Sequence, residues 1–160
     1  SYVAYNALYN EWDFGALVRT AWIDQSILGP PIGASSDGYL YQHETSNDGD
    51  GQAITAYFKT GYFSIANGND LVFVDRVLPD MIWGTYSGNK NAEIQISFNV
   101  VDYAGETPRT LGPYTVTKAT QYIDTRFRAR FVQIVVQSSD VGSFWRLGSM
   151  RYRFSSDGRR

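Results

Sequence analysis

Residues 127–154 read FRARFVQIVVQSSDVGSFWRLGSMRYRF, and they show the pattern of two long β-strands joined by a turn. Val132, Ile134 and Val136 are spaced by two, which is typical of one face of a half-buried strand. Ser138–Gly142 is polar and ends in glycine, which is typical of a turn. We therefore expect residues 127–154 to form a core-forming hairpin whose inner face carries the three apolar residues.

The same stretch is rich in arginine. Alternate residues of a strand share a face, so Arg126, Arg128 and Arg130 are expected together, and so are Arg151 and Arg153. The chain holds eleven Arg against three Lys, and guanidinium groups favour planar pairing at protein interfaces. We expect a protein interface first, a solvated sheet face second and contact with DNA phosphate third. The candidate interface residues are Arg126, Arg128, Arg130, Arg146, Arg151, Arg153, Arg159 and Arg160.

The composition favours a folded all-β protein. Aromatic residues make up 16% and fifteen glycines supply turns, while the absence of cysteine excludes disulfides and thiolate metal sites. Residues 1–125 carry fourteen acidic and six basic side chains, whereas residues 126–160 carry eight Arg and two Asp. This asymmetry indicates a basic surface facing an anionic partner, or two ends that meet. No apolar run approaches the roughly 20 residues of a membrane span, and we expect no cofactor.

The order of patterns predicts three segments. Residues 1–25 read as a hairpin of the kind found in β-propeller blades, which one copy cannot complete by itself. Either it packs on the rest of the chain, or the chain is the C-terminal part of a longer protein. Residues 26–38 contain Pro-Pro and three glycines, and are expected to be a linker or long loop. Residues 39–160 are expected to form the main domain.

The main domain is predicted to be an antiparallel β-sandwich, jelly-roll-like, with seven to nine strands. Residues 93–101 alternate most cleanly, with Ile94, Ile96, Phe98 and Val100 pointing one way. A strand is expected over residues 53–63, and Pro79 is expected either to end the strand that begins at Leu71 or to demote it to an edge strand. Residues 105–113 are expected to be a loop before a strand over residues 114–119.

Signals of catalysis or metal binding are weak. The single histidine, His43, has no nucleophile elbow or histidine-rich site around it and is expected at a surface or strand edge. Asp48 and Asp50 lie in an Asp-Gly turn, which is favoured over a cation site because the spacing of a calcium loop is absent. We therefore expect no enzyme activity.

Aromatic rings near turns offer an alternative function, a carbohydrate-binding β-sandwich module. Sugar faces stack on exposed planar rings, whereas core or rim packing is the more ordinary role of such residues. We favour packing. The candidate rings are Trp83, Tyr86, Tyr103 and Tyr114.

Several segments together resemble a viral protein family. They are EWDFGALVRTAWID (11–24), DGYLYQHE (37–44), DGDG (48–51), GYFSIANGNDLVFVDRVLPD (61–80) and FWRLGSMRYRFSSDGRR (144–160). The chain resembles the C-terminal part of tail hub or nozzle proteins of short-tailed bacteriophages, some of which are described as packaged-DNA stabilisation proteins.

The resemblance implies a structural role in the virion tail. It implies a homo-hexameric ring that extends the portal, contacts other tail or portal-adjacent proteins and conducts DNA. In the family a propeller-like body precedes the β-rich C-terminal region, which would account for the blade-like residues 1–25. This chain is too short to contain that body.

Overall fold

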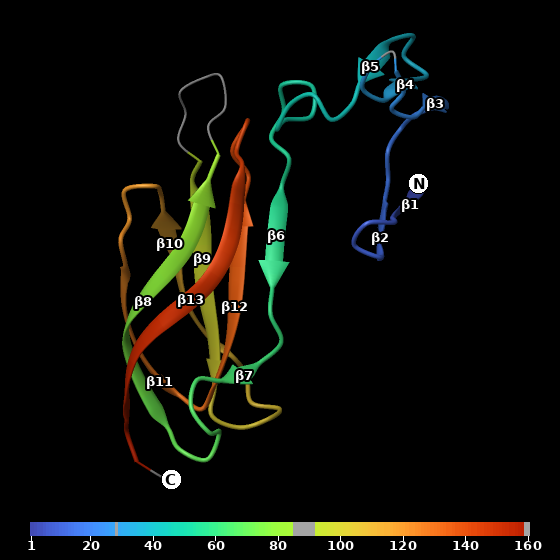
Figure 1. Cartoon of the computed structure of the whole chain (residues 1–160). Helices are drawn as coiled ribbons and strands as arrows, with labels where there is room; N and C mark the ends of the chain where they lie inside the picture. The colour runs from blue at the N-terminus through green and yellow to red at the C-terminus, as the bar shows by residue number, and fades with distance from the viewer. Residues whose placement is uncertain (28, 85–91, 159–160) are drawn as a thin grey trace. The chain divides into compact units, whose positions relative to one another are not determined.

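The computed structural model describes residues 1–27, 29–84 and 92–158, and it is all-β. The chain divides into two compact units, Ser1–Ser46 (unit 1) and Asn47–Arg160 (unit 2). Unit 1 contains the hairpin of β1 (Tyr2–Asn6) with β2 (Glu11–Gly15), as the sequence predicts. It also contains an antiparallel sheet of β3 (Ala21–Ile23), β4 (Ile32–Ala34) and β5 (Leu40–Gln42) (Figure 1).

The boundary between the units differs from the expected segments. Strand β4 lies inside the expected linker, and β5 lies in the expected main domain although it pairs with β4. The reason is a tight turn at residues 35–39, where the Ser35 amide donates to the Tyr39 carbonyl and Gly38 has a φ of 88°. The glycine therefore closes a hairpin instead of loosening a linker.

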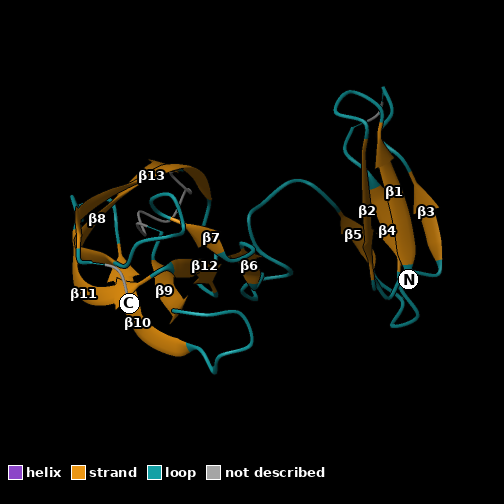
Figure 2. Ribbon diagram, turned by 90° about the horizontal axis from the view of Figure 1, so that it is seen from below, coloured by secondary structure: helices purple, strands orange, loops and turns teal. Residues whose placement is uncertain are grey.

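Unit 2 is the β-sandwich that the sequence predicts. Its five-stranded sheet has the order β10–β9–β12–β6 with β7 also on β12, and its three-stranded sheet has the order β11–β8–β13 (Figure 2). The bounds are β6 (Ala56–Lys59), β7 (Phe63–Ser64), β8 (Val72–Trp83), β9 (Ile94–Val101), β10 (Arg109–Val116), β11 (Ile123–Ala129), β12 (Phe131–Ser138) and β13 (Trp145–Ser156).

The core lies between these two sheets. The alternation predicted for β9 is confirmed, because Ile94, Ile96, Phe98 and Val100 are all buried. The Phe98 ring lies 5.9 Å from that of Phe127, which belongs to β11 of the opposite sheet. The sandwich is therefore held together by apolar side chains from both layers.

The prediction that residues 127–154 form a hairpin is wrong. Strand β12 pairs with β9, β6 and β7, whereas β13 pairs with β8 in the other sheet. The chain also crosses between sheets at Arg130, where β11 ends and β12 begins. A period of two fixes which side chains point inward, but it is the same for strands that pair and for strands that face each other across a core. Val132, Ile134 and Val136 do point into that core, as expected.

Pro79 does not end its strand. Strand β8 continues to Trp83, and Pro79 pairs with Met150 where the register of β13 shifts by a bulge. Its other neighbour, β11, reaches only to Val77. Proline is tolerated because it lies beside a bulge, on a part of β8 that has only one neighbouring strand.

Two other strand boundaries also differ from those that the sequence predicts. Strand β10 begins at Arg109, inside the expected loop, because a register shift between Leu111 and Tyr114 accommodates Gly112 and Pro113 in an edge strand. The strand expected over residues 53–63 is interrupted between β6 and β7. The interruption includes Thr60, whose hydroxyl accepts a hydrogen bond from the Ile134 amide.

Candidate interaction surfaces

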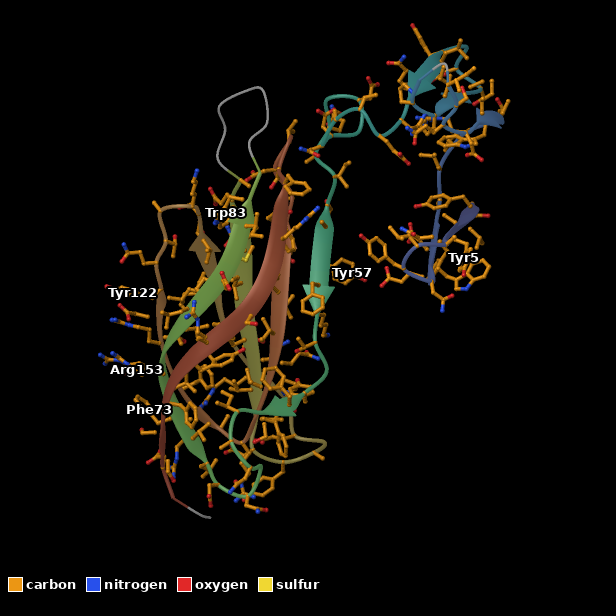
Figure 3. All side chains as sticks on the ribbon, viewed as in Figure 1. Tyr5, Tyr57, Phe73, Trp83, Tyr122 and Arg153 are labelled. Carbon is orange, nitrogen blue, oxygen red and sulfur yellow. The ribbon has the colours of Figure 1, made fainter. Side chains whose placement is uncertain are left out.

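The outer face of the three-stranded sheet carries most of the predicted arginines. Strand β11 buries every second residue and exposes Arg126 and Arg128, while β13 exposes Arg146, Arg151 and Arg153. We call these five residues the arginine surface. Figure 3 shows Arg153 on this side of unit 2.

Two members of the arginine surface are paired with carboxylates of unit 2. Arg153 donates two hydrogen bonds to Asp75, one of them from Nε to Oδ1 over 2.7 Å. These bonds lower the pKa of the Asp75 carboxyl and raise that of the Arg153 guanidinium. Arg128 reaches Asp157 beyond the end of β13, with Nε 2.6 Å from Oδ2. The positive charges of Arg128 and Arg153 are therefore neutralised by carboxylates of the same unit.

Arg126 and Arg151 differ from Arg128 and Arg153 in their contacts. Both are exposed, and neither makes an ion pair or side-chain hydrogen bond within the described ranges. Arg151 stands opposite Leu78, and Arg146 stands opposite Ile82, which is 64% exposed. Arginine is among the residues that are enriched at protein interfaces.

Arg130 does not share the face of Arg126 and Arg128. It is half-buried at the crossing between β11 and β12, where its guanidinium carbon lies 5.1 Å from the centre of the Tyr103 ring. The expectation failed because the strand ends one residue before Arg130, so the alternation of faces ends there too. Arg159 and Arg160 lie outside the described residues.

Hairpin β1–β2 presents a second uncovered surface. One face carries two cross-strand pairs, Val3 with Phe14 and Tyr5 with Trp12, and all four side chains are at least half exposed. We call these four residues the aromatic face. The Tyr5 and Trp12 rings are 4.7 Å apart. The period of two in YVAYN and EWDFG could have revealed this face.

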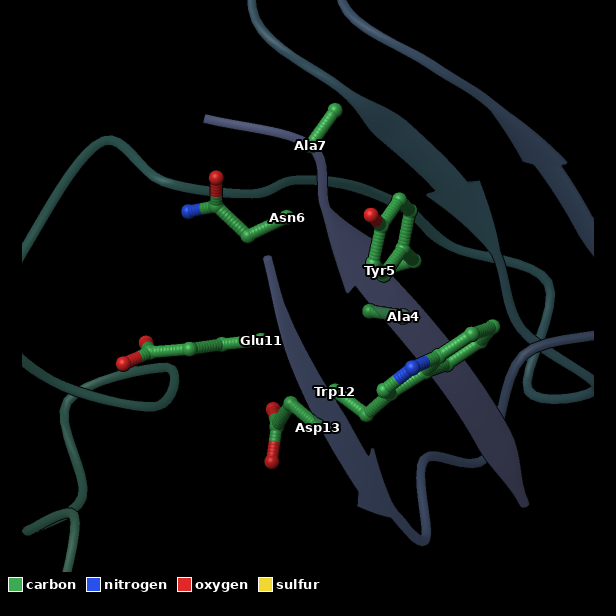
Figure 4. A pocket seen from close by; sticks show the side chains of 7 residues that line it. All are labelled: Ala4, Tyr5, Asn6, Ala7, Glu11, Trp12 and Asp13. Carbon is green, nitrogen blue, oxygen red and sulfur yellow. The ribbon is translucent and has the colours of Figure 1, made fainter. Parts of the chain in front are cut away.

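The opposite face of the hairpin is polar. Figure 4 shows an open hollow beside the hairpin, with the carboxylates of Glu11 and Asp13 directed away from the Trp12 ring. Asp13 accepts a hydrogen bond from the Tyr2 hydroxyl, and its charge raises the pKa of that tyrosine. The hollow is nevertheless lined from both faces, by Tyr5 and Trp12 as well as by Glu11 and Asp13.

Unit 1 has almost no core. Among its described residues only Pro31 and Gly33 are buried. The sheet β3–β4–β5 is organised around Gly33, against which Arg19 and His43 pack. Arg19 Nε donates to His43 Nε2 over 3.1 Å, and the Arg19 guanidinium lies 4.1 Å from the centre of the Tyr41 ring. His43 is thus a packing residue directly after β5, close to the strand-edge position expected for it.

Acid should weaken this sheet through His43. Burial and the neighbouring Arg19 lower the pKa of His43 below its ordinary value of 6.5, outweighing the opposite effect of Glu44. The folded state therefore binds fewer protons, and stability is lost as the pH falls through 6.5 toward the folded pKa. We expect faster amide exchange in β3–β5 at about pH 5.5 than at about pH 7.5, after correction for intrinsic rates. His43→Gln, which does not titrate, should remove this pH dependence; an unchanged dependence would contradict the assignment.

The candidate sugar-stacking rings do not form one platform. Trp83 is half-buried, packs against the core and stands opposite Trp145 at the end of β8. Tyr114 is also half-buried, and its hydroxyl lies 2.9 Å from Thr125 Oγ1. Tyr103 is exposed in the turn after β9, and Tyr86 lies outside the described residues. Packing therefore explains Trp83 and Tyr114.

The Asp-Gly segment forms a tight turn. Asp50 and Gly51 have φ angles of 56° and 73°, and Gly49 and Gln52 form an isolated antiparallel bridge. The Asp48 carboxylate accepts a hydrogen bond from the Gly51 amide over 2.8 Å. Asp48 is thus used to close the turn. Throughout the part of the chain that the structure describes, no three His, Asp or Glu side chains gather as they would around a metal ion.

A scan against protein-family models finds no match for this chain, and a search of curated proteins finds none either. Within the described residues, no helix has the length and apolar character needed to cross a membrane.

Proposed function

We propose that this chain is a non-enzymatic assembly module of a bacteriophage tail. It would be a subunit or domain of a hub or nozzle ring that binds neighbouring tail proteins and lines or extends the DNA conduit. The lack of a core in unit 1 carries this proposal. Five strands that bury only Pro31 and Gly33 among the described residues leave apolar surface exposed, which a partner protein would cover and so stabilise.

The uncovered side chains support protein contacts over DNA contacts. The aromatic face offers large rigid rings, which are common among the residues that dominate binding energy. The arginine surface alternates with Asp75 and Asp124, so it is not a continuous stripe of positive charge. A phosphate backbone would favour such a stripe.

The test is whether loss of the arginine surface blocks assembly. Arg126→Glu with Arg151→Glu should leave the circular dichroism spectrum unchanged, because both side chains are exposed and neither makes an ion pair or side-chain hydrogen bond within the described residues. We expect the unaltered chain to sediment as an oligomer and this variant to sediment as a monomer. Arg153 is unsuitable for the test because it binds Asp75.

The matched control is Lys59→Glu with Lys118→Glu. It makes the same change in net charge at exposed residues that lie outside the three-stranded sheet. This control should assemble normally. Monomeric behaviour of the unaltered chain would contradict the ring, and equal assembly of both variants would contradict the role of the arginine surface.

The same sedimentation experiment also tests the aromatic face. Trp12→Ser with Phe14→Ser should also reduce assembly, because both rings are more than 70% exposed and would lose the burial that a partner provides. Normal assembly of this variant would remove the aromatic face from the proposal and leave the arginine surface as the sole contact.

A further inference from the structure

The outer face of the five-stranded sheet has a different chemical character from the arginine surface. Four directly paired residues form a row across it: Tyr57 on β6, Gln137 on β12, Gln95 on β9 and Thr115 on β10. Residues paired in this way point to the same face of a sheet. Because Val136 is fully buried, the neighbouring Gln137 and the rest of the row point outward.

Most polar side chains on this face are already used. Asn99 donates to Gln133 over 3.0 Å, Gln133 donates to the Thr60 carbonyl, and Thr110 donates to Asn99. Gln95 is hydrogen-bonded to Thr115 and to Glu93. The exposed amide of Gln137 makes no side-chain hydrogen bond to the described residues.

Gln137 borders a hollow at one end of this sheet. The hollow has a volume of about 400 Å³, within the range of small-ligand pockets. It is lined by two amides (Gln95 and Gln137), two carboxylates (Glu93 and Asp140) and three hydroxyls (Thr55, Ser138 and Ser139), of which Ser138 already accepts a hydrogen bond from Trp145. No Lys, Arg or His lines it among the described residues, so an anionic ligand would find no positive charge.

This donor and acceptor set suits a ligand that carries several hydroxyl groups. Carboxylates accept hydrogen bonds from hydroxyls, and an amide can both donate and accept. Tyr57 does not line the hollow itself but is paired with Gln137, which does; its ring is 75% exposed and makes no ring contact within the described ranges. Figure 3 shows Tyr57 at β6, on the edge of the five-stranded sheet. A planar ring next to polar groups fits the apolar face and the hydroxyl rim of a pyranose.

We propose that this hollow is a binding site for a neutral sugar. Glu93, Gln95, Gln137 and Asp140 would hold adjacent hydroxyls, and Tyr57 would stack on the ring. The site lies on the opposite sheet from the arginine surface, and it involves none of the rings that the sequence suggests. It therefore goes beyond the proposed assembly function and does not depend on it.

Saturation-transfer NMR on the full chain tests the site. The probes are methyl glycosides of glucose, galactose, mannose and N-acetylglucosamine, together with maltose, cellobiose and lactose. We expect transfer to at least one of them, and roughly tenfold weaker binding by Gln137→Ala and by Tyr57→Ala. Gln121→Ala and Tyr62→Ala, exposed residues that do not line the hollow, are the matched controls.

The possible results separate this site from the assembly function. Absence of transfer to every probe would overturn the proposal, and so would binding that both Gln137→Ala and Tyr57→Ala leave unchanged. Arg126→Glu with Arg151→Glu should block assembly and leave sugar binding intact. Loss of sugar binding in that variant would place the ligand elsewhere and also contradict the site.

Discussion

Phe98→Ala is expected to lower the free energy of unfolding of unit 2 by about 3–5 kcal/mol. Phe98 is fully buried on β9, and its ring lies 5.9 Å from Phe127 and 6.0 Å from Tyr114. Phe127 belongs to the opposite sheet and Tyr114 to the neighbouring strand, so truncation leaves a cavity that strands of both sheets border. A marginally stable domain can lose most of its stability in this way.

Urea denaturation followed by tryptophan fluorescence measures this effect. A Trp12→Phe, Trp22→Phe background leaves Trp83 and Trp145, both in unit 2, as the only reporters. The matched control is Phe154→Ala, because Phe154 is 49% exposed on β13 and should cost no more than about 1 kcal/mol. Equal losses for the two variants would contradict the central position of Phe98.

The inward residues of unit 2 could be predicted because they depend on local alternation. Ile94, Ile96 and Phe98 on β9, like Val132 and Ile134 on β12, are spaced by two and are all buried. Pairing could not be predicted in the same way. Whether β13 joins β12 or β8 depends on contacts between distant residues, such as Arg153 with Asp75, which no local pattern contains.

At the candidate interface too, local alternation predicts which side chains share a face but not which partners they have. Alternation correctly placed Arg126 and Arg128 on one outer face. It could not show that Arg128 pairs with Asp157 or that the chain crosses to the other sheet at Arg130, because both facts depend on where the strands end. Arg126 and Arg151 become the better candidates for an interface only once the partners of the other arginines are known.

Gly33→Val is expected to unfold the sheet β3–β4–β5 while leaving unit 2 intact. A Cβ atom at position 33 would lie 2.8 Å from Arg19 Cδ and 3.1 Å from His43 Nε2. Arg19 cannot move aside without losing its hydrogen bond to His43 and its stacking on Tyr41. Overpacking of this kind costs about 1–3 kcal/mol. Because unit 1 buries so little else among its described residues, we expect that cost to exceed the stability of this sheet.

Hydrogen exchange detected by mass spectrometry distinguishes the two units. In Gly33→Val the amides of Thr20 and His43, which donate to the Ala34 and Pro31 carbonyls, should lose protection. Protection in β8 and β9 of unit 2 should stay unchanged, because the two units form separate clusters of contacts.

The matched control is Ala21→Val, which enlarges an exposed residue of β3 in the same sheet and should have little effect on protection. Retained protection in Gly33→Val would show that Arg19 and His43 do not depend on the space that glycine leaves. Loss of protection in both units would show that unit 1 is not a separate folding unit.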